Sequence, residues 1–144
     1  MSKHSYNKVW LHLIWGTKRR DKLIPHKTQP YIAKKLISIA TEKGFSIRAC
    51  HVNADHVHTL IDMPTNLSIE QLAKLLKGVS SHWINSDKII PEQFKWNKGY
   101  AVFSVSESGV KRVIRYIQNQ EEHHKQKTFH EEVKEFLKAS PSSP

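Results

Sequence analysis

Residues 9–15 constrain the fold more than any other segment, because they are apolar on both faces of an extended chain. Alternate residues of a strand point to opposite faces of a sheet. One face would carry Val9, Leu11, Leu13 and Trp15, and the other Trp10 and Ile14. Such a strand is typical of the centre of a sheet, where both faces are covered. The sequence therefore predicts a sheet between two helical layers.

Cap and turn residues locate the elements that follow this strand. Residues 28–40 are predicted to form a helix, with Thr28 as its N-cap and Gly44 just past its end. Residues 45–52 and 56–63 are predicted to form two strands joined by a tight turn. The first half of the chain is thus β-α-β-β.

The second half is predicted to add a helix, a β-hairpin and a final helix. Residues 68–71, Ser-Ile-Glu-Gln, form a capping box, which is typical of a helix start. Residues 94–96 and 100–105 are predicted strands around a turn at residues 97–99. A last long helix is predicted from Gly109 onward.

The complete order is β-α-β-β-α-β-β-α, which places the chain in the α+β class. Antiparallel pairing with two helices on one face is typical of a ferredoxin-like or RRM-like sheet. The C-terminal helix, which bears Tyr116, is the element left to cover the other face. We expect a single domain over residues 1–138 and a disordered tail over residues 139–144.

Two histidines, His56 and His58, flank one apolar residue on the predicted strand 56–63. Both imidazoles should project from the same face, because the side-chain period of a strand is two. Ten histidines in 144 residues give roughly 0.7 such pairs by composition alone. Taken alone, the pair is better interpreted as two half-buried histidines bonded to the backbone.

Tyr116 and Gln120 change that interpretation, because they lie four residues apart and share one face of the final helix. At about 100° per residue, Tyr116 lies on the shoulder of the apolar stripe rather than within it. Strand and helix together offer two ring nitrogens and an amide oxygen to a divalent metal, with a phenol beside it. This set suits phosphodiester transfer, in which the metal polarises the phosphate while the tyrosine oxygen attacks.

Four segments carry a more specific similarity. They are Asp55-His56-Val57-His58, Leu75-Leu76-Lys77-Gly78-Val79-Ser80-Ser81, Trp96-Asn97-Lys98-Gly99-Tyr100 and Tyr116-Ile117-Gln118-Asn119-Gln120. In this order, the chain from Trp10 to about Phe136 resembles the HUH-superfamily single-tyrosine transposases of bacterial insertion sequences. That group includes the REP-associated tyrosine transposases.

The resemblance implies a transposase that cleaves and rejoins single-stranded DNA at ends marked by DNA hairpins. It implies that Tyr116 attacks and forms a 5′-phosphotyrosine intermediate. The metal would be Mg²⁺ or Mn²⁺, with His56, His58 and Gln120 as its protein ligands, although two imidazoles also suit zinc. Asp55 is predicted to orient one histidine by accepting a hydrogen bond from it.

The resemblance also implies a homodimer. In related enzymes two sheets join edge to edge, and the tyrosine helix of one subunit serves the histidine pair of the other. Residues 105–109, before the final helix, form a short connection that contains Gly109. Assembly of the site within one chain or between two chains therefore stays open.

The chain has a formal net charge of +10, from 23 lysines and arginines against 13 aspartates and glutamates. Such an excess in a small domain indicates a polyanionic partner, and nucleic acid is the first choice. In related transposases the loop after the first strand and the second helix lie along hairpin DNA. Phosphate contacts are therefore predicted for Lys18, Arg19, Arg20, Lys74 and Lys77.

The tryptophans divide into two pairs. Trp10 and Trp15 are expected in the core, whereas Trp83 and Trp96 suit either the core or base-stacking platforms. The only cysteine, Cys50, excludes a disulfide framework and a cysteine zinc site. No apolar run approaches the length of a membrane span and the first residues lack a signal-peptide core, so we expect a cytoplasmic protein.

Three alternative functions deserve comparison. A replication initiator or relaxase of the HUH superfamily would show a third histidine or paired tyrosines, whereas Tyr116 stands alone. A domesticated REP-type protein that nicks or only binds DNA hairpins would share the fold. A zinc hydrolase would need a third histidine or carboxylate ligand, and the sequence shows none at a suitable spacing.

Overall fold

The structure is a computed structural model that describes residues 5–120 and 128–139. Four strands form one antiparallel sheet in the order β2-β3-β1-β4. They are β1 (Trp10–Gly16), β2 (Ser46–Val52), β3 (His56–Asp62) and β4 (Ala101–Val105). The tail predicted at residues 139–144 lies outside the described residues, except for residue 139.

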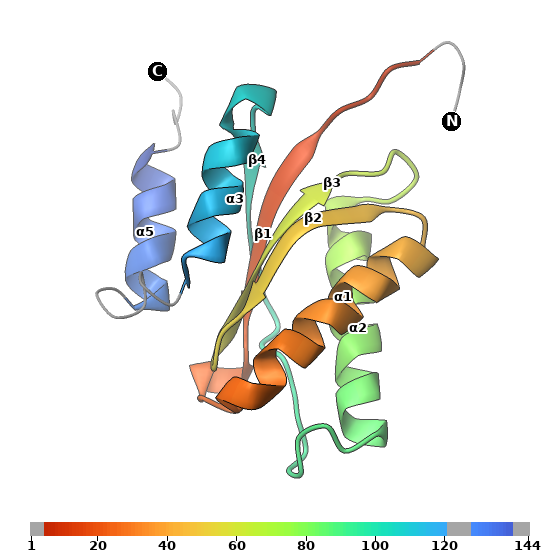
Figure 1. The fold of residues 1–144 in the computed structure, drawn as a ribbon, viewed down its shortest axis with the longest axis vertical. Coiled ribbons are helices and arrows are strands. Elements are labelled where there is room, and N and C mark those ends of the chain that lie inside the picture. The colour runs from red at the N-terminus through yellow and green to blue at the C-terminus, as the bar shows by residue number, and fades with distance from the viewer. Residues whose placement is uncertain (1–4, 121–127, 140–144) are drawn as a thin grey trace.

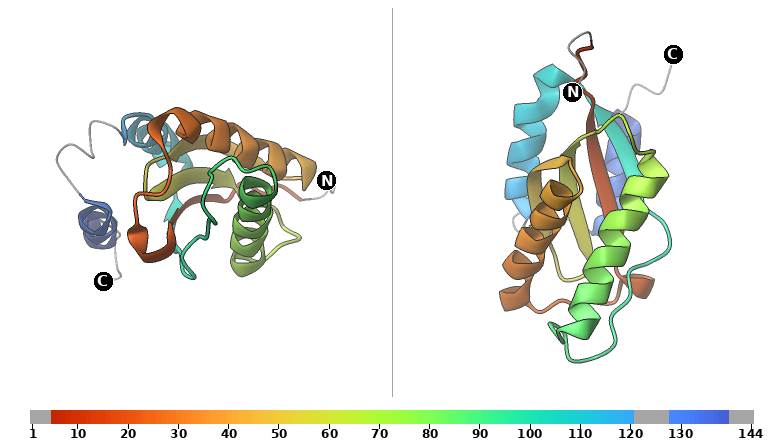
Figure 2. Two further views of the ribbon diagram at one scale, coloured as in Figure 1. Left: turned by 90° about the horizontal axis from the view of Figure 1, so that it is seen from below. Right: turned by 90° about the vertical axis from the view of Figure 1, so that its right-hand side faces the viewer.

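Helices cover both faces of this sheet (Figure 1). One face packs against α1 (Gln29–Glu42) and α2 (Ile69–Ser86), and the other face lies toward α3 (Val110–Gln118) and α5 (Phe129–Ala139). Figure 2 shows the same layers from below and from the side. The predicted α+β class, with two helices on one face and the tyrosine-bearing helix on the other, is confirmed.

The central position of β1 is also confirmed, because all seven of its residues are buried. Residues of β1 and β3 that face α1 and α2 join the larger apolar cluster, including Leu13, Trp15 and Val57. Trp10 and Leu60 point to the opposite face and pack with residues of α3. Helix α3 thus supplies cover that the second face of β1 requires.

Local signals act largely as the sequence indicates. Ser68 and Gln71 form the capping box: Gln71 N–H donates to Ser68 Oγ at 3.0 Å, and Ser68 N–H donates to Gln71 Oε1 at 2.9 Å. Gly44 follows α1 with φ = 87°, in the left-handed region that glycine tolerates best. Thr28 occupies the N-cap of α1, but its side chain makes no capping bond.

The hairpin predicted at residues 94–105 is wrong, because residues 94–96 do not form a strand. The side chain of Asn85 binds both backbone groups of Phe94, at 2.8 Å and 2.9 Å, and so competes with strand pairing. Trp96 makes one isolated bridge to Thr17. Only β4 forms from this part of the chain, at the edge of the sheet.

Trp96 belongs to the core. Its side chain is buried, packs edge-on against Trp15 and Phe94, and donates from Nε1 to Ser80 Oγ at 2.9 Å. The indole N–H is therefore satisfied inside the protein, as a buried tryptophan requires. This removes the stacking-platform interpretation for Trp96 and leaves it open for Trp83.

The single long helix predicted from Gly109 is also wrong. In the described part of the chain, α3 ends at Gln118 and α5 begins at Phe129. Residues 121–127 lie outside the described residues. The change has a functional consequence, since α5 returns to the sheet and contributes to the site.

Candidate active site

His56 and His58 lie on β3 in the interior of the sheet, and both side chains are fully buried. Their ring centroids are 5.1 Å apart. Each ring is held through its Nδ1 atom: that of His56 lies 2.7 Å from Oδ1 of Asp55, and that of His58 lies 2.9 Å from Nε2 of His12. Such partners fix the orientation of a ligand ring, and the Nε2 atom of each ring lies on the side of Glu132.

Tyr116 and Gln120 reach this histidine pair within one chain. The Tyr116 ring centroid lies 5.8 Å from that of His58, and the Tyr116 side chain is half-buried. Gln120 is fully buried and accepts a hydrogen bond at Oε1 from Nδ2 of Asn53, at 3.3 Å. Asn53 Nδ2 also lies 3.3 Å from Nε2 of His56. The turn between β2 and β3 therefore links Gln120 to the histidine pair.

Glu132, on α5, is a site residue that the sequence patterns did not identify. The prediction that no third histidine or carboxylate accompanies the histidine pair is therefore wrong. The buried carboxylate of Glu132 lies 3.5 Å from Nε2 of both His56 and His58. Oε2 of Glu132 accepts hydrogen bonds from the Tyr116 hydroxyl and, at 3.2 Å, from Nε2 of Gln120. One carboxylate thus joins the histidine pair to the tyrosine.

A signal for Glu132 was present in the sequence. Phe136 follows it by four residues on α5, so that the carboxylate shares an apolar helix face. A carboxylate on an apolar face is rarely buried without a partner. His12 offers a similar signal, because it interrupts the apolar strand β1 on the face of Trp10 and Ile14.

The electrostatics of the site depend on burial and on the two carboxylates. Burial, followed by the neighbouring His58, lowers the pKa of His12 well below its usual value, so that ring is neutral. Burial also acts to lower the pKa of His56, but the hydrogen bonds and charges of Asp55 and Glu132 outweigh it and raise that pKa overall. Burial first, and then Glu132, raises the pKa of Tyr116, which keeps the phenol protonated.

The donor set fits a divalent metal. Ligand atoms of His56, His58 and Glu132 all lie within 4.8 Å of one another, and all three residues are buried. Two imidazoles with one carboxylate suit first-row divalent ions, so this cluster can hold a metal. Gln120 presents Nε2 to Glu132 here, and only its Oε1 could bind a metal. Its role as a ligand stays a prediction.

Three of the residues predicted to contact DNA gather in one hollow of about 590 Å³. Lys18, Arg19 and Lys77 line it together with Lys95 and Lys98. Lys77 Nζ donates to the carbonyls of Lys98 and Gly99, each at 3.1 Å, which ties α2 to the loop before β4. None of the described residues lining this hollow is acidic. We refer to this hollow as the α2–loop hollow.

Two further residues predicted to contact DNA lie outside it. Lys74 is exposed and faces Glu70 one turn earlier, with Nζ and Oε1 4.0 Å apart. Arg20 lies beside the hollow in the turn Lys18–Arg20, with φ = 58°. Their contacts with DNA stay predictions.

Within the described part of the chain, no helix is both long enough and apolar enough to cross a membrane.

Comparison with known proteins places these features in one family. Residues 5–120 match the family described as "Transposase IS200 like". The chain is 28% identical over 117 residues to the ISDra2 transposase TnpA of Deinococcus radiodurans, a match that spans 76% of this chain and 81% of that protein.

Solved structures agree with the fold. A crystal structure of a candidate transposase from Deinococcus radiodurans R1 has a TM-score of 0.65 and 30% identity, covering 83% of this chain and 96% of that one. A REP-associated tyrosine transposase bound to a REP hairpin has a TM-score of 0.59 at 16% identity, covering 86% and 74%. The second likeness concerns the fold alone.

Proposed function

The chain belongs to the IS200-like transposase family, and from that premise we propose that it cleaves and rejoins single-stranded DNA through a 5′-phosphotyrosine at Tyr116. The observation that carries the proposal is the Glu132 carboxylate, which contacts both histidines and accepts the hydrogen bond of the Tyr116 hydroxyl. Nucleophile, metal donors and a proton acceptor therefore meet at one point. The REP-hairpin complex of the structural relative supports hairpin DNA as the substrate class.

In the proposed reaction, the Tyr116 oxygen attacks the scissile phosphorus and its proton passes to Oε2 of Glu132, which already accepts its hydrogen bond. The bond from phosphorus to the 3′ oxygen breaks, and that strand leaves with a 3′ hydroxyl. Attack by another 3′ hydroxyl on the phosphotyrosine reverses these steps and joins strands without ATP. The covalent intermediate conserves the bond energy.

We propose His56, His58 and Glu132 as the residues that hold a divalent metal, Mg²⁺ or Mn²⁺, with Gln120 beside them. When bound, the metal would polarise the phosphate and supply positive charge that favours the phenolate of Tyr116, whose pKa is raised first by burial and then by Glu132. Asp55 contacts the ring of His56, and His12 contacts the ring of His58, so both orient a metal donor without binding the metal themselves. They are positioning residues for the two Nε2 atoms.

Incubation of labelled hairpin DNA with the protein and Mn²⁺ tests the proposal directly. A transesterase yields a cleaved strand, whereas a domesticated protein that only binds DNA hairpins leaves the strand intact. The burial of His56, His58 and Glu132 side by side favours the enzyme. Burying such polar groups costs free energy, and a surface that only binds DNA does not require it.

DNA binding by the α2–loop hollow should depend strongly on salt. Each lysine that neutralises a phosphate releases counterion, so the Lys77→Ala variant should bind hairpin DNA more weakly and reduce the slope of log K against log [salt] by about 1. Fluorescence anisotropy between low and moderate salt measures both effects. Lys43→Ala, an exposed lysine at the far end of α1, should behave like the wild type. An unchanged slope for Lys77→Ala would remove the hollow from the DNA interface.

We also propose that the protein is a homodimer whose sites each assemble within one chain, as His58 and Tyr116 do here. Light scattering should give about twice the 16.7 kDa of the chain. Mixing inactive His58→Ala protein with inactive Tyr116→Phe protein should then leave cleavage at background, because every site lacks one group. Recovered cleavage would show instead that the tyrosine of one subunit serves the histidines of the other.

A further inference from the structure

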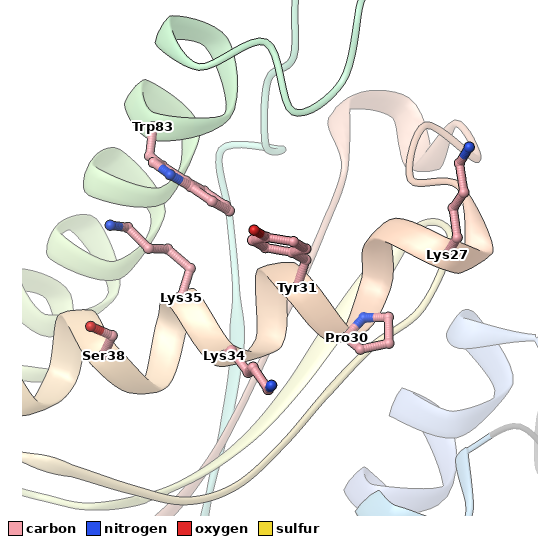
Figure 3. Close-up of a pocket in the computed structure, with 7 residues that line it drawn as sticks. All are labelled: Lys27, Pro30, Tyr31, Lys34, Lys35, Ser38 and Trp83. Atoms are coloured by element: carbon pink, nitrogen blue, oxygen red, sulfur yellow. The ribbon is translucent and has the colours of Figure 1, made fainter.

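A second hollow, of about 520 Å³, lies between α1 and α2 (Figure 3). These two helices cover the face of the sheet opposite to α3 and α5, which carry Tyr116 and Glu132 (Figure 1). The walls of the hollow carry two aromatic rings, Tyr31 on α1 and Trp83 on α2. The two hollows therefore lie on opposite sides of α2, since Lys77 and Ser81 line the first and Trp83 lines the second. The proposed chemistry does not use this aromatic pair, and only Trp83 packs against the core.

The rings of Tyr31 and Trp83 are stacked, with centroids 6.3 Å apart and planes inclined by 29°. Trp83 is half-buried and partly packs on the core, which anchors the pair. Tyr31 remains 66% exposed, so much of its ring is accessible to another flat ring. An exposed aromatic ring on a fixed support is the platform on which a nucleobase stacks, with little dependence on base identity.

Three lysines line the same hollow as this platform. Lys35 Nζ lies 5.3 Å from the Trp83 ring centroid, and Lys27 and Lys34 also line the hollow. Of the described residues that line it, none is acidic. Aromatic rings bind the base and lysines bind the adjoining phosphates, so the hollow matches both parts of an unpaired nucleotide.

The hollow also continues toward the catalytic cluster. Pro30 and Lys34 line both this hollow and a neighbouring one of about 310 Å³, which extends along the end of β2 to Val52. The next residue, Asn53, contacts both His56 and Gln120. A strand lying along these two hollows would pass around the edge of the sheet to the turn that borders the site.

We propose that Tyr31, supported by Trp83 and flanked by the three lysines, binds an unpaired base of the single-stranded DNA that leads to the cleavage site. The proposal rests on the proposed function for its choice of partner. It assigns the paired stem of the DNA to the α2–loop hollow and the unpaired strand to the opposite side of α2. Stacking, rather than phosphate contact alone, is the property that distinguishes the two surfaces.

Binding of two 12-nucleotide probes separates stacking from charge. One probe is oligo-dT, and the other is an abasic strand with the same phosphates. The wild type should bind oligo-dT about tenfold more tightly than the abasic strand, since one stacked base is worth roughly that factor. Tyr31→Ala should lose this preference, and Tyr31→Phe, which keeps the ring, should retain it. Tyr6→Ala, which removes an exposed tyrosine elsewhere, is the matched control.

Photo-crosslinking tests directly whether the base lies against Tyr31. Oligo-dT carrying 5-iodouracil should photo-crosslink to the peptide that contains Tyr31, and Tyr31→Ala should lose that product. The proposal is overturned if Tyr31→Ala keeps the wild-type preference, if it weakens both probes equally, or if wild-type protein shows no preference. None of these results affects the proposed function, which stands or falls on strand cleavage that depends on Tyr116.

Discussion

Tyr116→Phe should eliminate the covalent protein–DNA adduct and reduce strand cleavage by at least about 10³-fold, as the loss of a nucleophile generally does. The substitution removes one oxygen and keeps the ring that packs against Phe136 and His58. Folding and hairpin binding should therefore stay at wild-type levels. Only the bond between protein and 5′ phosphate is lost.

A substrate labelled on the 3′ side of the cut measures this outcome. With wild-type protein, the label should become attached to the chain, and proteolysis should locate it in the peptide that holds Tyr116. Tyr100→Phe, a tyrosine outside the cluster, should form the adduct normally. If the adduct persists in Tyr116→Phe, another residue is the nucleophile, and if the label transfers from the 5′ side, the polarity is wrong.

His58→Ala should abolish both metal binding and cleavage while hairpin binding is retained. Loss of this ring removes one of the three donors, and the two that remain are too few to hold the metal. Calorimetric titration with Mn²⁺ measures the metal directly, and cleavage should fall by at least about 10³-fold. Excess EDTA should do the same to the wild type.

His82→Ala is the matched control, because His82 is exposed on α2 away from the cluster. It should bind Mn²⁺ and cleave DNA like the wild type. Cleavage by wild-type protein that survives excess EDTA would contradict the metal assignment, whichever donors the cluster contains. Glu132→Gln would then separate the two roles of that carboxylate, since it keeps the shape and removes the charge.

The parts of the fold that depend on local patterns could be predicted from the sequence. A few adjacent residues were enough to predict three features: the central strand β1 with both faces buried, the capping box of α2, and the turn between β2 and β3. The strand predicted at residues 94–96 failed because its competitor, the side chain of Asn85, lies nine residues away in sequence. No window around Phe94 reveals that hydrogen bond.

In the candidate site too, the residues related by short spacings could be predicted, whereas those brought together only by the fold could not. The spacing within His56-Val57-His58, and between Tyr116 and Gln120, was enough to identify four members of the cluster. The position of Glu132 in the site depends instead on how the chain returns to the sheet after α3. Its distance in sequence from Tyr116 and from the histidines matches neither the period of a helix nor that of a strand, so no local pattern links it to them. The buried role of His12 likewise follows from the pairing of β1 with β3, which brings its ring to His58.

The order of these residues along the chain has a consequence for synthesis. All four strands of the described sheet precede Tyr116, and Glu132 comes later still, on the last helix described. Because domains emerge and begin to fold from the N-terminus, a nascent chain presents its histidine pair before its nucleophile and proton acceptor exist. On the proposed mechanism, a chain that ends before Tyr116 lacks the nucleophile and cannot cut DNA. Cleavage is reserved for the completed chain.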